Sequence, residues 1–217
     1  TDYPRRGSFS CSDPDLCAIH DMVAYTTVNL AFNGYMVDCG SFEKHGYGGD
    51  GNASTLTGQT LYDVAPLYYN WLQAWNDVVR DDGSLPNTAP STHPAGGGPY
   101  WCSFIIQAPW RTYMSYADDR NLAKGYPYMK QWLAFAEQSI EDGLYFRSVD
   151  GKDWGLGDWP SLSLLFYMTF YNKKTHEQPT HQPWSGHLCM DARIVCHPCV
   201  YIGKMGMAHA AKIAQRA

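Results

Sequence analysis

The chain has 217 residues, of which 45% are hydrophobic and 17% are charged, and its formal net charge is −5. This length and apolar content predict one sizeable hydrophobic core and exclude an intrinsically disordered chain. The sequence lacks the basic footprint of a nucleic-acid-binding protein, and no apolar run approaches the roughly 18 residues of a membrane span, so we expect neither nucleic acid nor membrane as a partner.

The first predicted helix begins near Leu16. Apolar residues recur along it at spacings of three, four and seven, which is the pattern of a helix that buries one face. They are Leu16, Ile19, Val23, Leu30 and Val37. We expect this helix to bury that face and to end near Asp38.

The same spacing predicts further helices along the chain. The clearest starts at Leu61 and follows the capping candidates Ser54, Thr55 and Thr57. Strand signals are nearly absent, so we expect an all-α fold with helical hairpins arranged around a centre. The predicted helices after the first are residues 61–78, 101–116, 122–140, 161–172 and 199–216.

Three predicted loops are unusually long. Residues 38–56, 81–100 and 142–160 each span about 20 residues, whereas helices are usually joined by a few, and such loops in a compact domain are commonly functional. All three are rich in Gly and Asp, and the third also contains Trp. We therefore look for the functional residues there.

The first of these loops carries three acids, Asp38, Glu43 and Asp50. Neighbouring carboxylates and aromatic walls hold one carboxyl group protonated toward neutral pH, as a general acid for glycosidic cleavage requires. Lys44 opposes this effect if it points inward. The alternative interpretation is a set of solvated loop acids with no chemical role.

The same loop matches the dinucleotide-binding spacing at Gly46, Gly48 and Gly51. That motif requires a preceding strand, and Asp50 would repel a pyrophosphate. We expect instead that the glycines let the backbone fold tightly, so that the acids and Tyr47 point into a shared pocket.

Aromatic residues are abundant, with 8 Trp and 16 Tyr. An aromatic ring beside a carboxylate suits a sugar, because the ring covers the apolar face and the carboxylate accepts hydroxyl protons. Trp101 at the end of the second loop and the Asp158–Trp159 pair in the third are the candidates. The alternative interpretation places these rings in the hydrophobic core.

Metal binding is not predicted. The chain has seven Cys, an odd number that excludes a complete set of internal disulfides and leaves the cellular compartment open. Cys196 and Cys199 form one CxxC pair, with His187, Cys189 and His197 nearby. A structural zinc site usually shows two paired ligand sets, so this single pair is weak.

Four ordered motifs resemble a known family. They are the stretch from Asp38 to Asp50, DGSLPNTAP, GGGPYW and LGDW. Together they resemble the catalytic domain of α-L-rhamnosidases of glycoside hydrolase family 78. The resemblance implies an (α/α)6 barrel of six helical hairpins and hydrolysis of terminal α-L-rhamnose with inversion, without a cofactor.

The resemblance also implies roles for individual residues. Glu43 matches the general acid of the family, and Asp38 and Asp50 match acids that hold rhamnose hydroxyls. Trp101 and Trp159 resemble ring-stacking residues, and Tyr47 and Asp158 complete the predicted substrate site. Gly40 and Phe42 stand where family members often have Pro and Arg, which changes the charge around the acid.

The length departs from the family, because about half of the helices of a closed barrel are predicted here. We expect residues 1–217 to form a single helical catalytic domain that is only part of the barrel, with the general base outside it. The expected partners are a rhamnose-containing oligosaccharide or glycoside and either the remainder of a larger enzyme or further copies of the chain. An incomplete barrel would expose a large apolar face.

Two other functions stay open at this point. A non-catalytic carbohydrate-binding protein would keep the sugar pocket and lack the base. An eliminating lyase would require a basic group near the site, for which Lys44, His45 and His93 are the candidates, and it is the weaker alternative.

Overall fold

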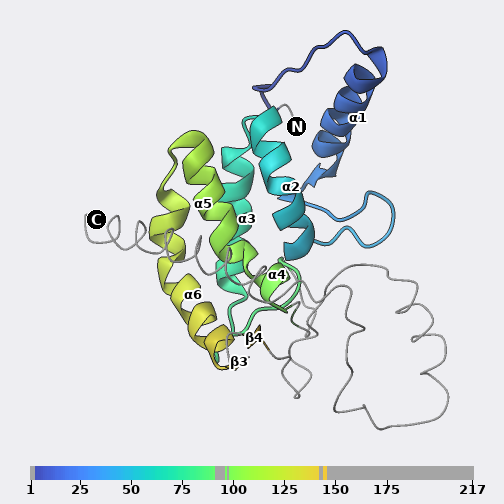
Figure 1. Cartoon of the computed structure of the whole chain (residues 1–217). Coiled ribbons are helices and arrows are strands. Elements are labelled where there is room, and N and C mark those ends of the chain that lie inside the picture. Colours follow the sequence, from blue (N-terminus) through green and yellow to red (C-terminus); the bar gives the residue numbers. More distant parts are fainter. Residues whose placement is uncertain (1–2, 91–95, 97, 142–143, 146–217) are drawn as a thin grey trace, which may run out of the picture.

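The computed structural model describes residues 3–90, 96, 98–141 and 144–145, and these are mostly helical (Figure 1). In Figure 1, α2, α3, α5 and α6 stand side by side, while α1 projects beyond them. The helices are α1 (Pro14–Leu30), α2 (Gly48–Leu61), α3 (Ala65–Asp77), α4 (Gly98–Cys102), α5 (Phe104–Tyr116) and α6 (Arg120–Glu137). Two short antiparallel hairpins pair β1 (Ala31–Phe32) with β2 (Tyr35–Met36) and β3 (Ile140–Glu141) with β4 (Leu144–Tyr145).

The helix α1 begins where its sequence provides a cap and ends earlier than predicted. The Asp13 side chain accepts hydrogen bonds from the backbone of Asp15 and Leu16, and Pro14 occupies the first helical position. The expectation that the helix continues to Asp38 is wrong. Asn33 and Gly34 have positive φ angles of 50° and 85° and turn the chain into the β1–β2 hairpin.

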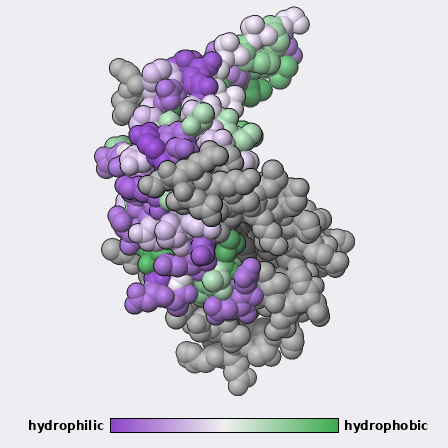
Figure 2. Space-filling model, turned by 90° about the vertical axis from the view of Figure 1, so that its left-hand side faces the viewer, coloured by the Kyte–Doolittle hydropathy of each residue, from purple (hydrophilic) through white to green (hydrophobic). Residues whose placement is uncertain are grey.

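The apolar stripe of α1 is not buried against the described residues, contrary to the prediction. Leu16, Ile19 and Val23 are 49%, 52% and 40% exposed, whereas Ala24 is the buried residue of this helix. In Figure 2 the projecting end of the molecule carries hydrophobic residues on its surface. The helical spacing therefore identifies an apolar face of α1, but the other described residues do not cover that face.

The helix α2 begins at Gly48, inside the segment predicted to be a loop up to residue 56. The predicted caps Ser54 and Thr55 lie within the helix, and their hydroxyls donate to the backbone carbonyls of Asp50 and Gly51, one turn earlier. The predicted helix 61–78 is in fact α3 with the last residue of α2. The first turn of α2 is rich in glycine, which has a low helix propensity, so the sequence does not indicate a helix there. The packing of α2 requires these glycines, as described below.

The core is aromatic and lies between α2, α3 and α5. The rings of Trp71 and Phe104 lie 4.5 Å apart, Trp75 lies 5.6 Å from Phe104, and all three side chains are fully buried. Tyr68 completes the cluster from the next turn of α3. The interpretation of aromatic residues as core is thus correct for three of the four aromatic residues of α3, Tyr68, Trp71 and Trp75.

The predicted helices 101–116 and 122–140 are confirmed with small changes. The first is divided at Ser103 into α4 and α5, and the second is α6, which ends at Glu137. Pro127 lies inside α6. The all-α prediction holds for the described residues, with the two hairpins as small additions.

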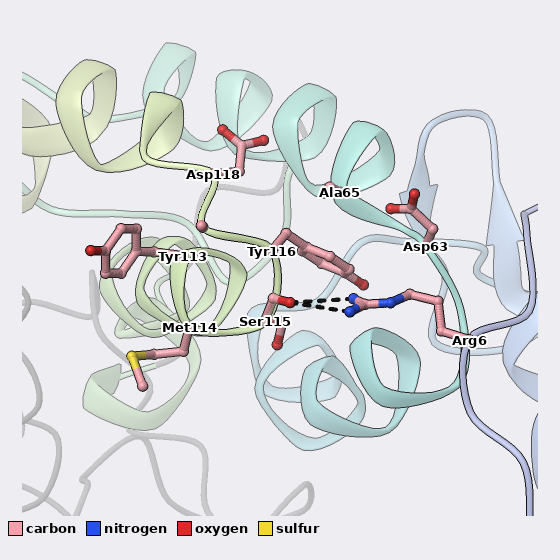
Figure 3. A pocket seen from close by; sticks show the side chains of 9 residues that line it. Arg6, Asp63, Ala65, Tyr113, Met114, Ser115, Tyr116 and Asp118 are labelled. Carbon is pink, nitrogen blue, oxygen red and sulfur yellow. Dashed lines mark hydrogen bonds between the residues drawn. The ribbon is translucent and has the colours of Figure 1, made fainter.

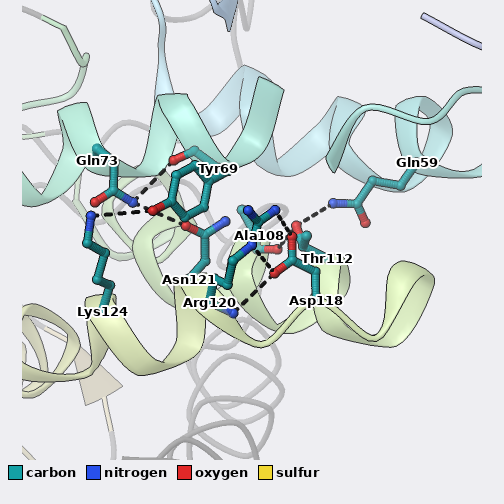
Figure 4. A network of polar contacts seen from close by, with 9 residues as sticks. All are labelled: Gln59, Tyr69, Gln73, Ala108, Thr112, Asp118, Arg120, Asn121 and Lys124. Carbon is teal, nitrogen blue, oxygen red and sulfur yellow. Dashed lines mark hydrogen bonds and ion pairs between the residues drawn. The ribbon is translucent and has the colours of Figure 1, made fainter. Parts of the chain in front are cut away.

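Polar contacts join neighbouring helices around the core (Figure 4). Gln59 of α2 donates to Thr112 of α5 at 2.8 Å, where both side chains are buried. Gln73 of α3 donates to Asn121 of α6 at 3.3 Å. Buried polar groups of this kind require their partners, so these contacts fix the relative positions of the helices.

Several predictions fall on other parts of the chain. The predicted loop 142–160 and the predicted helices 161–172 and 199–216 lie outside the described residues, apart from Leu144 and Tyr145 of β4. No helix among the described residues has the length and apolar character to cross a membrane.

Replacing Phe104 with Ala is expected to lower the free energy of unfolding by about 3–5 kcal/mol, because the lost ring leaves a cavity between two tryptophans. Chemical denaturation measures this change. Phe42 is 89% exposed, so Phe42→Ala is the matched control and should change the same quantity by less than about 0.5 kcal/mol. Equal effects of the two changes would contradict this description of the core.

Candidate functional site

The segment from Asp38 to Asp50, here called the acid loop, connects β2 with the first turn of α2. Asp38 closes it twice: its backbone N–H donates to the His45 carbonyl at 3.0 Å, and its Oδ1 accepts the His45 N–H at 2.8 Å. Tyr35 donates its hydroxyl to the Lys44 carbonyl at 3.1 Å. The residues between Asp38 and His45 therefore form a pinned loop that carries Glu43.

Glu43 is exposed, and a tyrosine holds its carboxyl group. The Tyr47 hydroxyl donates to Glu43 Oε2 at 2.6 Å, four residues further along the chain. Burial, this hydrogen bond and the nearby carboxylates all raise the pKa of Tyr47 well above its ordinary range. Tyr47 consequently keeps its proton at neutral pH and acts as a permanent donor to Glu43.

Lys44 points away from this carboxyl group. Its Nζ lies over the Phe32 ring, 5.9 Å from the ring centroid, in the β1–β2 hairpin. The backbone of Lys44 has a φ of 55°, a conformation that non-glycine residues adopt infrequently. The condition under which Lys44 would oppose the acids, an inward-pointing ammonium group, is thus not met.

Asp50 lies in the first turn of α2. Burial is the largest cause that raises its pKa, and the negative charges of Asp38 and Glu43 add to the effect, while a backbone hydrogen bond lowers it. The three acids are therefore close enough to interact electrostatically, as the sequence predicts.

The glycines of the acid loop allow two segments to approach it closely. A Cβ at Gly46 would collide with the Ala89 carbonyl, and a Cβ at Gly49 would collide with the Trp101 ring. Gly46 and Gly48 also form backbone hydrogen bonds with Ala89 and Asn87, at 3.0 and 3.1 Å. The tight fold predicted for these glycines is present.

Trp101 is brought to the acid loop by this contact. It lies in α4, its ring packs against Gly49, and the neighbouring Tyr100 ring stands edge-on to it at a centroid distance of 5.5 Å. The ring is partly exposed. The first two predicted functional loops therefore meet, and they place one candidate sugar-stacking ring against Gly49, the residue before Asp50.

Asn52 and Arg111 support this arrangement and were not anticipated from the sequence. Asn52 is 3% exposed, and its Nδ2 donates to the Tyr100 carbonyl at 2.5 Å and to Ser103 at 3.2 Å. Arg111 of α5 donates to the Asn52 carbonyl at 2.6 Å. Together they anchor α4, and with it Trp101, on α2. The one sequence signal for this anchoring role is that Asn52 follows Asp50 by two residues.

The remaining candidates cannot be placed. Asp158, Trp159 and the segment with the CxxC pair Cys196 and Cys199 lie outside the described residues. Over the ranges that are described, no cluster of three or more His, Cys, Asp or Glu side chains is arranged to hold a metal ion.

A groove of about 820 Å³ lies elsewhere, at the opposite end of α2 from the acid loop (Figure 3). Its lining includes Arg6, whose guanidinium stacks 4.6 Å from the centroid of the Tyr116 ring and donates to the Ser115 carbonyl. Asp63 and Asp118 flank it. This groove contains none of the predicted site residues.

A family comparison agrees with the resemblance found in the sequence. The model of the bacterial alpha-L-rhamnosidase 6 hairpin glycosidase domain matches residues 4–196. This match confirms the predicted family and, with the helical structure, the six-hairpin fold of which this chain is a part.

Individual relatives point the same way. An alpha-L-rhamnosidase of Formosa agariphila is 27% identical over 172 residues, which cover 73% of this chain and 17% of that protein. The alpha-L-rhamnosidase structure from Dictyoglumus thermophilum superposes with a TM-score of 0.73 at 20% identity, covering 100% of this chain and 22% of that one. The structure of the Streptomyces avermitilis alpha-L-rhamnosidase, solved in complex with L-rhamnose, superposes with a TM-score of 0.58 at 23% identity. That superposition covers 68% of this chain and 14% of the other. The chain spans about a sixth of the length of the curated relative.

The raised pKa of Asp50 predicts a pH-dependent effect of Asp50→Asn. Because the folded pKa lies above the unfolded value, the charged form is disfavoured in the folded state, and stability falls as pH rises between these two values. Asp50→Asn should therefore raise the free energy of unfolding at pH 7, by less than about 1 kcal/mol for a partly exposed charge. The gain should vanish below the ordinary Asp pKa.

Asp118→Asn is the matched control, and its effect should have the opposite sign. Hydrogen bonds from Arg120, at 2.6 and 2.9 Å, lower the pKa of Asp118, so this group stabilises the fold above its unfolded pKa. Denaturation curves at pH 3 and pH 7 test both variants. The same sign for both at pH 7 would contradict the electrostatic description of the acid loop.

Proposed function

Because the chain belongs to the bacterial α-L-rhamnosidase six-hairpin glycosidase family, we propose that it is part of a glycoside hydrolase that removes terminal α-L-rhamnose with inversion of configuration. The observation that carries the proposal is the exposed Glu43 carboxyl group, held by Tyr47 at 2.6 Å among three acids. The substrate is a rhamnose-containing oligosaccharide or glycoside, and no cofactor takes part.

In this proposal Glu43 is the general acid. Tyr47 donates to Oε2 of Glu43, so the transferable proton resides on Oε1, and Oε1 delivers it to the glycosidic oxygen. Negative charge then develops on the Glu43 carboxylate. The Tyr47 hydroxyl stabilises that charge, because its raised pKa keeps it protonated throughout the reaction.

The surrounding residues bind the sugar. Asp38 and Asp50 accept hydrogen bonds from rhamnose hydroxyls, and Trp101 covers an apolar face of the ring. The location of Trp101 against Gly49, directly before Asp50, supports this pairing of ring and carboxylate. Asp158 and Trp159 are proposed to complete the substrate site from the third predicted loop.

An inverting hydrolase also requires a general base. The base activates a water molecule on the opposite face of the sugar, and its carboxyl group lies roughly 6.5–9.5 Å from that of the acid. We assign this role to another part of the domain, since the curated relative is about six times as long as the matched segment. Residues 1–217 then represent one helical section of the catalytic domain.

The exposed side of α1 fits this division of the domain. In a ring of hairpins each hairpin contacts two neighbours, and α1 presents Leu16, Ile19 and Val23 at the edge of the described helices. A shallow apolar groove between α1 and α2, lined by Val23 and Leu56 among others, continues this surface. We propose that other helices of the same domain cover it.

Glu43→Gln in the complete enzyme is expected to reduce turnover of a rhamnoside with a poor leaving group by about 10² to 10⁴, because the leaving oxygen loses its proton donor. A rhamnoside with an activated aryl leaving group requires less protonation and should lose less activity. Steady-state kinetics with both substrates measure the difference. Near-normal activity of Glu43→Gln on the poor leaving group would refute the assignment.

Two further measurements separate this function from its alternative. Asp63→Asn neutralises an exposed carboxylate at the opposite end of α2, so it is the control and should retain full turnover. A non-catalytic carbohydrate-binding protein would instead bind rhamnose in calorimetry, lose this binding in Asp50→Ala and release no sugar. Binding without turnover by the complete protein would therefore favour the alternative.

A further inference from the structure

Two cysteines outside the candidate site have their thiols in contact. Cys11 precedes α1 and is exposed, and Cys17 lies in the first turns of α1 and is half-buried. Their Sγ atoms are 3.8 Å apart. Nothing in the proposed hydrolysis uses these thiols.

The capping of α1 produces this contact. Asp13 accepts hydrogen bonds from the first helical turn through its Oδ1, at 2.9 and 3.4 Å, and folds the chain back over that turn. The Cys11 thiol donates to the Asp13 carbonyl at 3.3 Å, and the Cys17 thiol donates to the Cys11 carbonyl at 3.7 Å. The two sulfurs therefore meet through local structure that the helix start itself fixes.

We propose that Cys11 and Cys17 form a reversible intramolecular disulfide by exchange with small-molecule disulfides. The Cys11 thiolate, the more exposed of the two, attacks one sulfur of the small disulfide and releases one small thiolate. The Cys17 thiolate then attacks the Cys11 sulfur of the mixed disulfide and releases the second. The protein loses two electrons and two protons, and the small disulfide is reduced to two thiols.

The geometry supports this bond. A disulfide places its sulfurs about 2.05 Å apart, so the two Sγ atoms must approach by roughly 1.8 Å, which rotations about the Cα–Cβ bonds supply. Cys102 differs in its surroundings, since it is buried and its thiol contacts the carbonyls of Leu85 and Pro86. Cys39 lies in the acid loop on the far side of the β1–β2 hairpin.

The disulfide would tie α1 to the N-terminal arm, residues 3–12. The arm already pairs with the end of α2 at Arg5 and Tyr62, and Arg5 lies 3.8 Å from Asp21 of α1. The Phe9 ring lies 5.4 Å from the His20 ring. A covalent link from the arm to the first turns of α1 therefore adds to the few contacts that hold this helix, whose apolar face the other described residues do not cover.

The test uses the full chain and bis(2-hydroxyethyl) disulfide, an uncharged probe that Asp13 and Asp15 do not repel. After oxidation, free thiols are alkylated and the protein is cleaved on the N-terminal side of each aspartate. Cleavage before Asp13 and Asp15 separates Cys11 from Cys17. Cleavage before Asp21 and Asp38 separates Cys17 from Cys39. Mass spectrometry should find peptide 2–12 linked to peptide 15–20. Dithiothreitol should release both peptides.

Single variants separate the two steps. Cys17→Ser should accumulate the mixed disulfide on Cys11, because the resolving thiol is absent. Cys39→Ser is the matched control and should form the same Cys11–Cys17 link as the natural chain. In thermal unfolding, oxidation should raise the midpoint by about 2–4 °C, and the Cys11→Ser/Cys17→Ser double variant should show no such rise.

Specific results would overturn the proposal. They are complete alkylation of Cys11 and Cys17 after oxidation, a link from either residue to another cysteine, and a disulfide between two chains. Because the peptide map is made on the natural chain, it decides the question even if a serine variant fails to fold.

Discussion

The close approach of a glycine-rich backbone to aromatic rings is the constraint on which the rest of the structure depends. At Gly46, Gly49 and Gly51 a side chain would collide with the segment around Ala89, with Trp101 and with Phe104, respectively. The first turn of α2 can rest on these groups only because the Cβ atoms are absent. This contact joins the acid loop to α4 and to the aromatic core, so the position of the acids and the stability of the core have the same origin.

The electrostatics of the acid loop follow from that packing. The glycine backbone holds Asp50 beside the loop closed by Asp38. Burial raises the pKa of Asp50 most, and the negative charges of Asp38 and Glu43 add to this effect. Tyr47, between the acids, supplies a hydroxyl whose pKa the same surroundings raise. The site therefore combines the exposed Glu43 carboxyl group with a fixed donor, an arrangement suited to proton delivery and to stabilising the carboxylate that results.

In the helix α1, local interactions determine the structure and tertiary packing contributes little. Its cap and its first turns are determined locally and place Cys11 and Cys17 in contact, yet its apolar face has few partners among the described residues. We propose above that this face lies between hairpins of one domain, and the match covers only 17% of the curated relative. The helix α1 is thus capped by its own sequence, although its apolar face is not buried by the other described residues.

The sequence by itself determined the helical class, the helices now seen as α5 and α6, the residues of the acid loop and the family, because helical periodicity and short ordered motifs are local properties of the chain. It did not reveal that α2 begins at Gly48 or that α1 ends at Leu30. Glycine has a low intrinsic helix propensity, so a helix opened by Gly48, Gly49 and Gly51 forms only because rings from α3, α4 and α5 pack against it. The exposure of the α1 stripe and the contact of Trp101 with Gly49 were likewise decided by tertiary structure, since periodicity identifies an apolar face and only packing determines which surface covers it.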